Sequence, residues 1–360
     1  MSTIAAIILF TTVIAYAVFG GADFGAGFWD LMAGGTERGD RPRRIIDHSI
    51  GPVWEANHVW LIFCFVVLWT CFPEAYASIT LTLFVPLTLA AVGIVLRGSG
   101  FAFRHAVFRT RDRRVFGALF ATSSVLVPYC LGAVAGAIAS GRVPDGGRAG
   151  DPIGSWINPT SILGGVLAVG TGAFLAATFL VWDAGRLDEA PMVEYFRRRA
   201  AGAATAMGVL SLIGVFVLRE DAKYLFAGLT TRGLPLVITA AVCGTAALVL
   251  LHRQSHSGAR LTAVVAVASI VLGWGVAQWD YILPESLTLE AAIAPDGTVI
   301  AVLVAVGLAT VFILPAFALL YRLDQRGFLP KEGAEDSPGE PRPDSPLPAI
   351  TKPIGRSSEH

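Results

Sequence analysis

Nine apolar stretches fill most of this 360-residue chain, and each is long enough to cross a lipid bilayer. A helix needs about 20 mostly apolar residues to span the hydrocarbon core. The stretches cover residues 4–33, 50–72, 76–97, 115–139, 160–183, 201–218, 234–252, 261–281 and 298–321. With 54% hydrophobic and only 15% charged residues, no part of the chain offers the polar surface of a soluble domain. Backbone groups in lipid must also be satisfied within each segment. We therefore predict an all-α polytopic membrane protein with about nine transmembrane helices.

The net charge of zero hides an asymmetry between the loops. Short loops rich in Lys and Arg stay in the cytoplasm. The first, third, fifth and seventh connections hold 16 Arg residues, whereas the even-numbered connections hold only 5 Lys or Arg residues. This difference places the odd-numbered connections in the cytoplasm, the N-terminus outside and the C-terminus inside. We expect a bacterial cytoplasmic membrane protein. The short sixth stretch, 201–218, is the weakest of the nine, and its loss would reverse the orientation of everything after it.

The spacing of the stretches suggests two groups of four helices and one extra helix. A loop rich in Gly and Pro separates the groups, and the last 30 or so residues alternate Pro with Ser and charges, a composition typical of disorder. The expected divisions are a first four-helix bundle (1–140), an external loop (141–159), a second four-helix bundle (160–281), an external loop with the ninth helix (282–327) and a disordered cytoplasmic tail (328–360).

The first stretch contains a carboxylate among small residues, in Gly-Gly-Ala-Asp-Phe-Gly-Ala-Gly, residues 20–27. Asp23 lies about 28 Å along the helix from Ile4, at 1.5 Å per residue, which places it near the cytoplasmic face. One interpretation is that Asp23 only accepts hydrogen bonds and fixes packing. The other is a functional site, because an ionisable residue inside a membrane is costly and needs a reason.

The second stretch opens with Pro-Val-Trp-Glu-Ala-Asn-His-Val-Trp, residues 52–60. Helical spacing puts Trp54, Asn57 and His58 on one face and brings Glu55 next to His58. A carboxylate beside an imidazole could relay protons near neutral pH. The alternative is that Glu55 only favours the helix N-terminus, while Trp54 and Trp60 anchor the helix at the interface.

Arg97 closes the third predicted stretch, in Leu-Arg-Gly-Ser-Gly-Phe, residues 96–101. An arginine that extends from a helix end to the membrane surface is common. The predicted topology, however, puts Asp23, Glu55 and Arg97 at one membrane face, where the guanidinium could pair with one carboxylate and leave the other free to titrate.

Direct cofactor or metal binding by this chain is not expected. A haem needs axial His or Met at membrane depth, and His58 is the only good candidate. The four cysteines show no Cys-x-x-Cys spacing, so neither a zinc site nor a disulfide framework is indicated.

The three motifs, residues 20–27, 51–62 and 96–101, resemble the signature segments of subunit II of cytochrome bd quinol oxidase, in the same order and at similar spacing. The resemblance is specific over roughly the first 130 residues. It implies a nine-helix subunit of two four-helix bundles plus one peripheral helix. It also implies a haem-bearing subunit I as partner, which would hold haems b and d and the site of quinol oxidation.

In that family, electrons from quinol reduce dioxygen to water and protons come from the cytoplasm. Position by position, the resemblance gives Asp23 the place of the first-helix acid, Trp54 that of the second-helix Trp, and Arg97 that of the Arg closing the third helix. Glu55 stands where many members have Asp, on a proton route between the subunits. Some members have an acid early in the fourth helix, where this chain has Gly117, so a route through that segment is in doubt.

The resemblance therefore predicts a subunit without haem that supports assembly and proton delivery. Membrane lipid, a small accessory subunit and a structural quinone are possible companions, and no nucleic acid is expected. Two other classes stay open: a proton-coupled secondary transporter, for which Gly-interrupted helices are typical, and a scaffold whose charges only hold the complex together.

Overall fold

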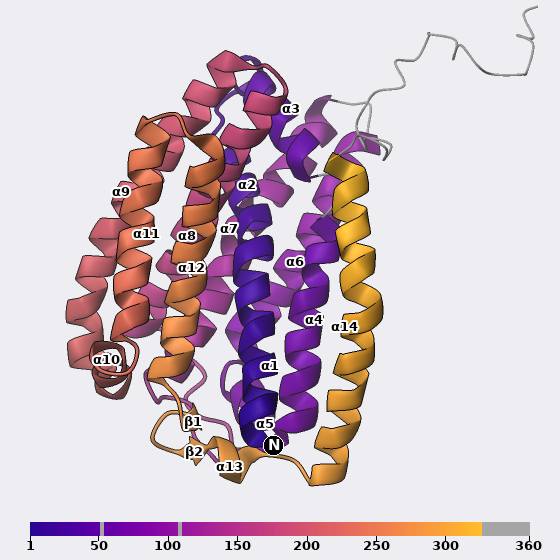
Figure 1. Ribbon diagram of the computed structural model, residues 1–360. Helices are drawn as coiled ribbons and strands as arrows, with labels where there is room; N and C mark the ends of the chain where they lie inside the picture. Colours follow the sequence, from indigo (N-terminus) through magenta and orange to yellow (C-terminus); the bar gives the residue numbers. More distant parts are fainter. Residues whose placement is uncertain (51–53, 107–109, 326–360) are drawn as a thin grey trace, which may run out of the picture.

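The computed structural model describes residues 1–50, 54–106 and 110–325, and these residues form a bundle of long helices (Figure 1). The helices and strands are α1 (Ser2–Ala15), η1, a π-helical turn (Tyr16–Gly20), α2 (Gly21–Leu31), α3 (Thr36–Ile50), α4 (Trp54–Cys71), α5 (Pro73–Thr82), α6 (Phe84–Ala106), α7 (Thr110–Ala139), α8 (Pro159–Arg186), α9 (Ala190–Asp221), α10 (Lys223–Thr230), α11 (Leu234–His252), α12 (His256–Ala277), β1 (Tyr281–Leu283), β2 (Leu287–Thr288), α13 (Leu289–Ala292) and α14 (Asp296–Gln325).

Eight helices in the described residues are long and apolar enough to cross a membrane, and the bent pair α4–α5 brings the number to nine. The predicted fold class is therefore confirmed. In the first group of spans, α1–η1–α2, α4, α6 and α7 pack together, and in the second group α8, α9, α11 and α12 do so. The two groups meet mainly where α8 packs on α2 and α7. Helix α14 lies at the edge of the bundle, chiefly against α4 (Figure 1).

Two predicted span boundaries are corrected. The third span is not 76–97: residues 73–82 form α5, which turns by 119° from α4, and the span itself is α6. The break follows from Pro73, which disfavours a helical conformation at the residue before it and starts the next helix. The sixth span is not short. Helix α9 has 32 residues, because the residues on both sides of the apolar stretch, which include Arg and Glu, are also helical.

The end of the bundle that carries the N-terminus is closed by short elements. Helix α5, the antiparallel pair β1–β2 and α13 lie there together (Figure 1). They bury an apolar cluster with the ends of α1, α4 and α14, in which Phe72 and Leu83 are fully enclosed. The backbone N–H of Ala294 donates to the carbonyl of Cys71, which the break after α4 leaves without a helical partner.

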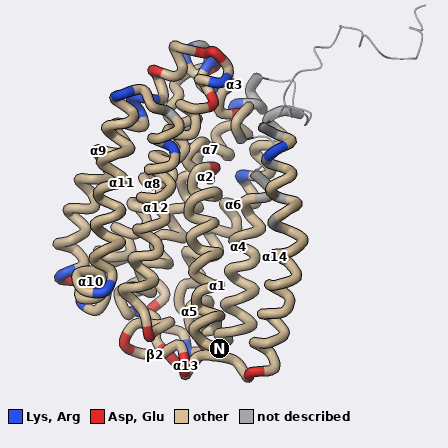
Figure 2. The backbone as a smooth tube through the Cα atoms, viewed as in Figure 1, with Lys and Arg blue, Asp and Glu red and all other residues tan. Residues whose placement is uncertain are grey.

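Charge is distributed unevenly between the two ends of the molecule. Figure 2 shows many Lys and Arg, together with some Asp and Glu, at the end where α3 lies, whereas Asp and Glu predominate near β2 and α13 and a smaller group of Lys and Arg lies at α10. At the basic end, Arg43 of α3 donates to Asp30 Oδ1 at 2.6 Å and to the carbonyl of Gly34 at 2.7 Å. These bonds fasten α3 across the end of α2.

Close packing of α2 on α8 depends on glycine. A Cβ on Gly25 would overlap the backbone carbonyl of Gly172, and Trp29 of α2 donates its indole N–H to the carbonyl of Ala173 at 2.7 Å. Small residues at such crossings let two backbones approach in the membrane. The first helix is thereby held directly against the second group.

Gly25→Ala should weaken this contact, because the two backbones must separate. Overpacking of this kind costs roughly 1–3 kcal/mol, so the melting temperature of the purified protein should fall. Gly244→Ala in α11 is the matched control, since a Cβ there meets nothing within 4 Å. Equal melting temperatures for the two variants would contradict this account of the helix contact.

Candidate functional site

Arg97 is the most deeply buried cation in the described part of the chain, with 1% of its surface exposed. The sequence placed it at a helix end, where it could reach water. Instead it lies inside α6, which continues to Ala106. The helix continues through Gly100 because this residue lies against α7: a Cβ there would come within 2.9 Å of the Phe116 carbonyl oxygen and the Phe120 nitrogen.

Asp23 is the partner of Arg97. The guanidinium Nη2 donates to Asp23 Oδ1 at 2.8 Å and to the Asp23 backbone carbonyl at 3.3 Å. Nε donates to Ser124 Oγ on α7 at 3.1 Å. The charged pair therefore joins three helices, α2, α6 and α7.

Aromatic rings enclose the pair. The guanidinium carbon of Arg97 lies 4.8 Å from the ring centre of Phe24 and 4.9 Å from that of Phe120. Cations are attracted to aromatic faces, and more strongly where water is excluded. A Cβ on Gly27 would overlap Ser124, so glycine at this position lets α7 approach α2 at the level of the pair.

The second span brings His58 to the same place. Its ring lies 5.9 Å from that of Phe24 and 6.3 Å from that of Tyr16, between ring centres, and it is within electrostatic range of Arg97. Three of the four predicted polar residues, Asp23, His58 and Arg97, therefore converge.

The other predicted residues of the second span are less closely involved. Asn57 is buried, and Trp60 stacks on Phe19 with ring centres 6.5 Å apart. Trp54 and Glu55 belong to the first turn of α4, but their side chains lie outside the described part of the structure.

Sequence reasoning missed Tyr16 and Ser124. Tyr16 precedes Asp23 by seven residues, two helical turns, which was the available signal for a shared face. Ser124 gave no signal, because a single serine in an apolar helix usually bonds its own backbone, as this one does to the Phe120 carbonyl at 2.7 Å.

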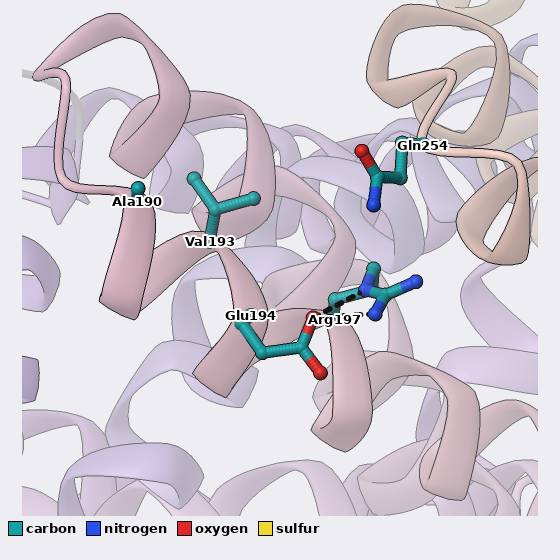
Figure 3. Close-up of a pocket in the computed structure, with 5 residues that line it drawn as sticks. All are labelled: Ala190, Val193, Glu194, Arg197 and Gln254. Atoms are coloured by element: carbon teal, nitrogen blue, oxygen red, sulfur yellow. Dashed lines mark hydrogen bonds and ion pairs between the residues drawn. The ribbon is translucent and has the colours of Figure 1, made fainter.

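The described side chains form no metal centre at this cluster. Within residues 1–50, 54–106 and 110–325, no three His, Cys, Asp or Glu side chains group as a metal site. A pocket of about 320 Å³ lies elsewhere, where α9 begins near the α11–α12 turn, and Figure 3 shows Glu194 and Arg197 paired in its wall (Figure 3). This internal pairing leaves that pocket little charge for a ligand.

Breaking the buried pair should destabilise the protein strongly. Arg97→Met leaves the Asp23 carboxylate without its cation, and such a loss costs about 3–5 kcal/mol. The double variant Arg97→Met with Asp23→Leu should recover part of that stability, because no charge stays buried. Unfolding of the purified protein measures both. Arg44→Met is the control: its pair with Asp40 is exposed and should have little measurable effect. If the double variant lost as much stability as Arg97→Met and Asp23→Leu lose in sum when made singly, Arg97 and Asp23 would not be directly coupled.

Comparisons with known proteins agree with the motifs. Residues 1–324 match the family described as cytochrome bd terminal oxidase subunit II. Cytochrome bd ubiquinol oxidase subunit 2 of Bacillus subtilis is 30% identical over 147 residues, 41% of this chain and 43% of that protein. Cytochrome bd-I ubiquinol oxidase subunit 2 of Escherichia coli K12 is 29% identical over 218 residues, 57% of this chain and 54% of that protein. The chain thus matches about half the length of these curated relatives.

The fold is similar to a chain in the structure of bd oxidase from Geobacillus thermodenitrificans. The TM-score is 0.72 at 23% identity, and the match covers 89% of this chain and 98% of that one. With the family match over nearly all of the described residues and the nine-span architecture, this chain belongs to the cytochrome bd terminal oxidase subunit II family.

Proposed function

We propose that this chain is the subunit II of a bd-type terminal oxidase that oxidises quinol and reduces dioxygen to water. It works beside a haem-bearing subunit I and helps that subunit to assemble. The single observation that carries the proposal is the buried cluster of Asp23, Arg97 and His58 in a chain whose residues 1–324 match the family.

The cofactors belong to the partner in this proposal. Haems b and d in subunit I would carry the electrons from quinol and provide the dioxygen-binding iron. A structural quinone, a small accessory subunit and bound lipid are compatible companions.

We further propose that the N-terminus lies outside and the C-terminus in the cytoplasm. The support is the uneven charge distribution in Figure 2, because basic residues favour the cytoplasmic side. The first span runs from Ser2 to Leu31, so Asp23 is about 12 Å from the basic end at 1.5 Å per residue. The cluster would then lie nearer to the cytoplasm, the source of the protons that dioxygen reduction consumes.

Asp23, Glu55 and His58 would pass protons toward the oxygen site of the partner, with Arg97 holding Asp23 in place. The apolar cluster around Phe72 and Leu83 closes the opposite end of the first bundle, which favours proton entry from one side only. The first bundle (1–140) would carry this role, and the second bundle (160–281) would support it through the α2–α8 contact.

A proton-coupled transporter is the second candidate. The π-helical turn η1 and the bent pair α4–α5 are irregular segments of the kind that transporters use. Purification of the tagged chain from its own membranes separates the two. A red complex with a larger haem-bearing chain supports the oxidase. A colourless chain that moves protons and solute alone in vesicles would contradict it.

Glu55→Gln in the assembled complex tests the proton role. Turnover of dioxygen should fall severalfold, because the amide cannot carry a proton, while the haem spectrum and the amount of complex stay unchanged. Glu290→Gln on the exposed surface of α13 is the control and should keep full turnover. Loss of haem in proportion to activity would favour the purely structural scaffold, and unchanged turnover at every pH would remove Glu55 from the route.

A further inference from the structure

Three polar atoms of the cluster have no hydrogen-bond partner in the described part of the chain. They are the Tyr16 hydroxyl, the second carboxylate oxygen of Asp23 (Oδ2) and one terminal guanidinium nitrogen of Arg97 (Nη1), and all three are buried. Buried polar groups are almost always paired, either with protein or with ordered water. Three such atoms in one place therefore need a common explanation.

The three atoms belong to one neighbourhood. The Tyr16 ring meets the Phe24 ring edge-on with centres 6.3 Å apart, and the same Phe24 ring faces the Arg97 guanidinium at 4.8 Å. Asp23 and Arg97 are both within electrostatic range of the Tyr16 hydroxyl. Phe24 therefore contacts both the Tyr16 ring and the Arg97 guanidinium.

The local backbone directs Tyr16 to this place. Tyr16 opens the π-helical turn η1, and wide turns of this type are frequent at functional sites. Its ring lies across Gly20, where an added Cβ would come within 2.8 Å of the ring carbons Cδ2 and Cε2. Glycine at position 20 leaves the space that the ring occupies.

We infer that Tyr16, Asp23 and Arg97 together bind buried water. The donors and acceptors are complementary: Arg97 Nη1 donates, Asp23 Oδ2 accepts, and the Tyr16 hydroxyl does both. A buried water normally makes two to four hydrogen bonds, which these atoms supply. Tyr16 is a positioning residue in this site.

The functional consequence rests on the proposed oxidase function. Water held against Asp23 Oδ2 gives the carboxylate a proton donor inside the membrane. The water passes a proton to Oδ2 and takes another from the cytoplasmic side. Oδ2 then releases its proton toward the oxygen site of the partner subunit, where dioxygen reduction consumes it, so the charge of the cluster is unchanged after each transfer.

Electron cryomicroscopy of the purified protein at a resolution that shows waters tests the site directly. We expect a density peak within about 3 Å of at least two of the three atoms, and its loss or displacement in Tyr16→Phe. A dry site in the wild type, with Oδ2 and Nη1 bonded to each other, would overturn the inference. This test does not require the oxidase function, because it applies equally to the chain alone or in a complex.

Oxygen consumption by the assembled complex tests the consequence. Tyr16→Phe should lower turnover severalfold with haem content unchanged, and Gly20→Ala should do the same by displacing the ring. Tyr195→Phe is the matched control: it also removes a buried hydroxyl that has no partner among the described residues, but away from the cluster, and turnover should stay at the wild-type level. Full turnover in Tyr16→Phe would remove Tyr16 from the route even where the water peak is present.

Discussion

The ion pair between Asp23 and Arg97 constrains the rest of this structure. Two opposite charges lie between helices that are otherwise apolar, with the guanidinium almost completely buried. A charge at this depth is tolerated only when it is paired and hydrogen-bonded. Helices α2, α6 and α7 are therefore tied to one register, because a shift of one of them would leave a charge without its partner.

The packing around the pair follows from that constraint. Glycines at positions 25, 27 and 100 bring backbones close enough for short side chains to meet across the helices. Aromatic rings fill the remaining space and exclude bulk water. The surroundings of the cluster differ between the two ends of the first bundle. An apolar cluster closes the end that carries the N-terminus, whereas basic residues lie at the end near α3. Such an arrangement suits exchange of protons with one side.

The sequence was informative wherever hydrophobicity or charge dominated. The length of the apolar stretches predicted the nine spans, and the cost of buried charge pointed to Asp23 and Arg97. Boundaries were less predictable: Arg97 was placed at a helix end, and the contact of Gly100 with α7 explains why the helix continues. A break after residue 72 was expected, but the end of α5 at Thr82 was missed, because α5 is apolar enough to pass for the start of the third span.

The role of Tyr16 was also out of reach from sequence. Its spacing from Asp23 indicates a shared helix face, but the π-helical turn η1 and the buried hydroxyl without a partner among the described residues are visible only in the structure. The side chain of Glu55 lies outside the described residues, so its place in the cluster stays a prediction.

In the proposed function, Asp23 exchanges protons during turnover and does more than hold Arg97. Infrared difference spectroscopy of the assembled complex during turnover measures this directly. A carboxyl C=O band should appear and disappear with turnover in the wild type and be absent from Asp23→Asn. A spectrum without any band that depends on Asp23, together with normal turnover in Asp23→Asn, would show that the pair is structural only.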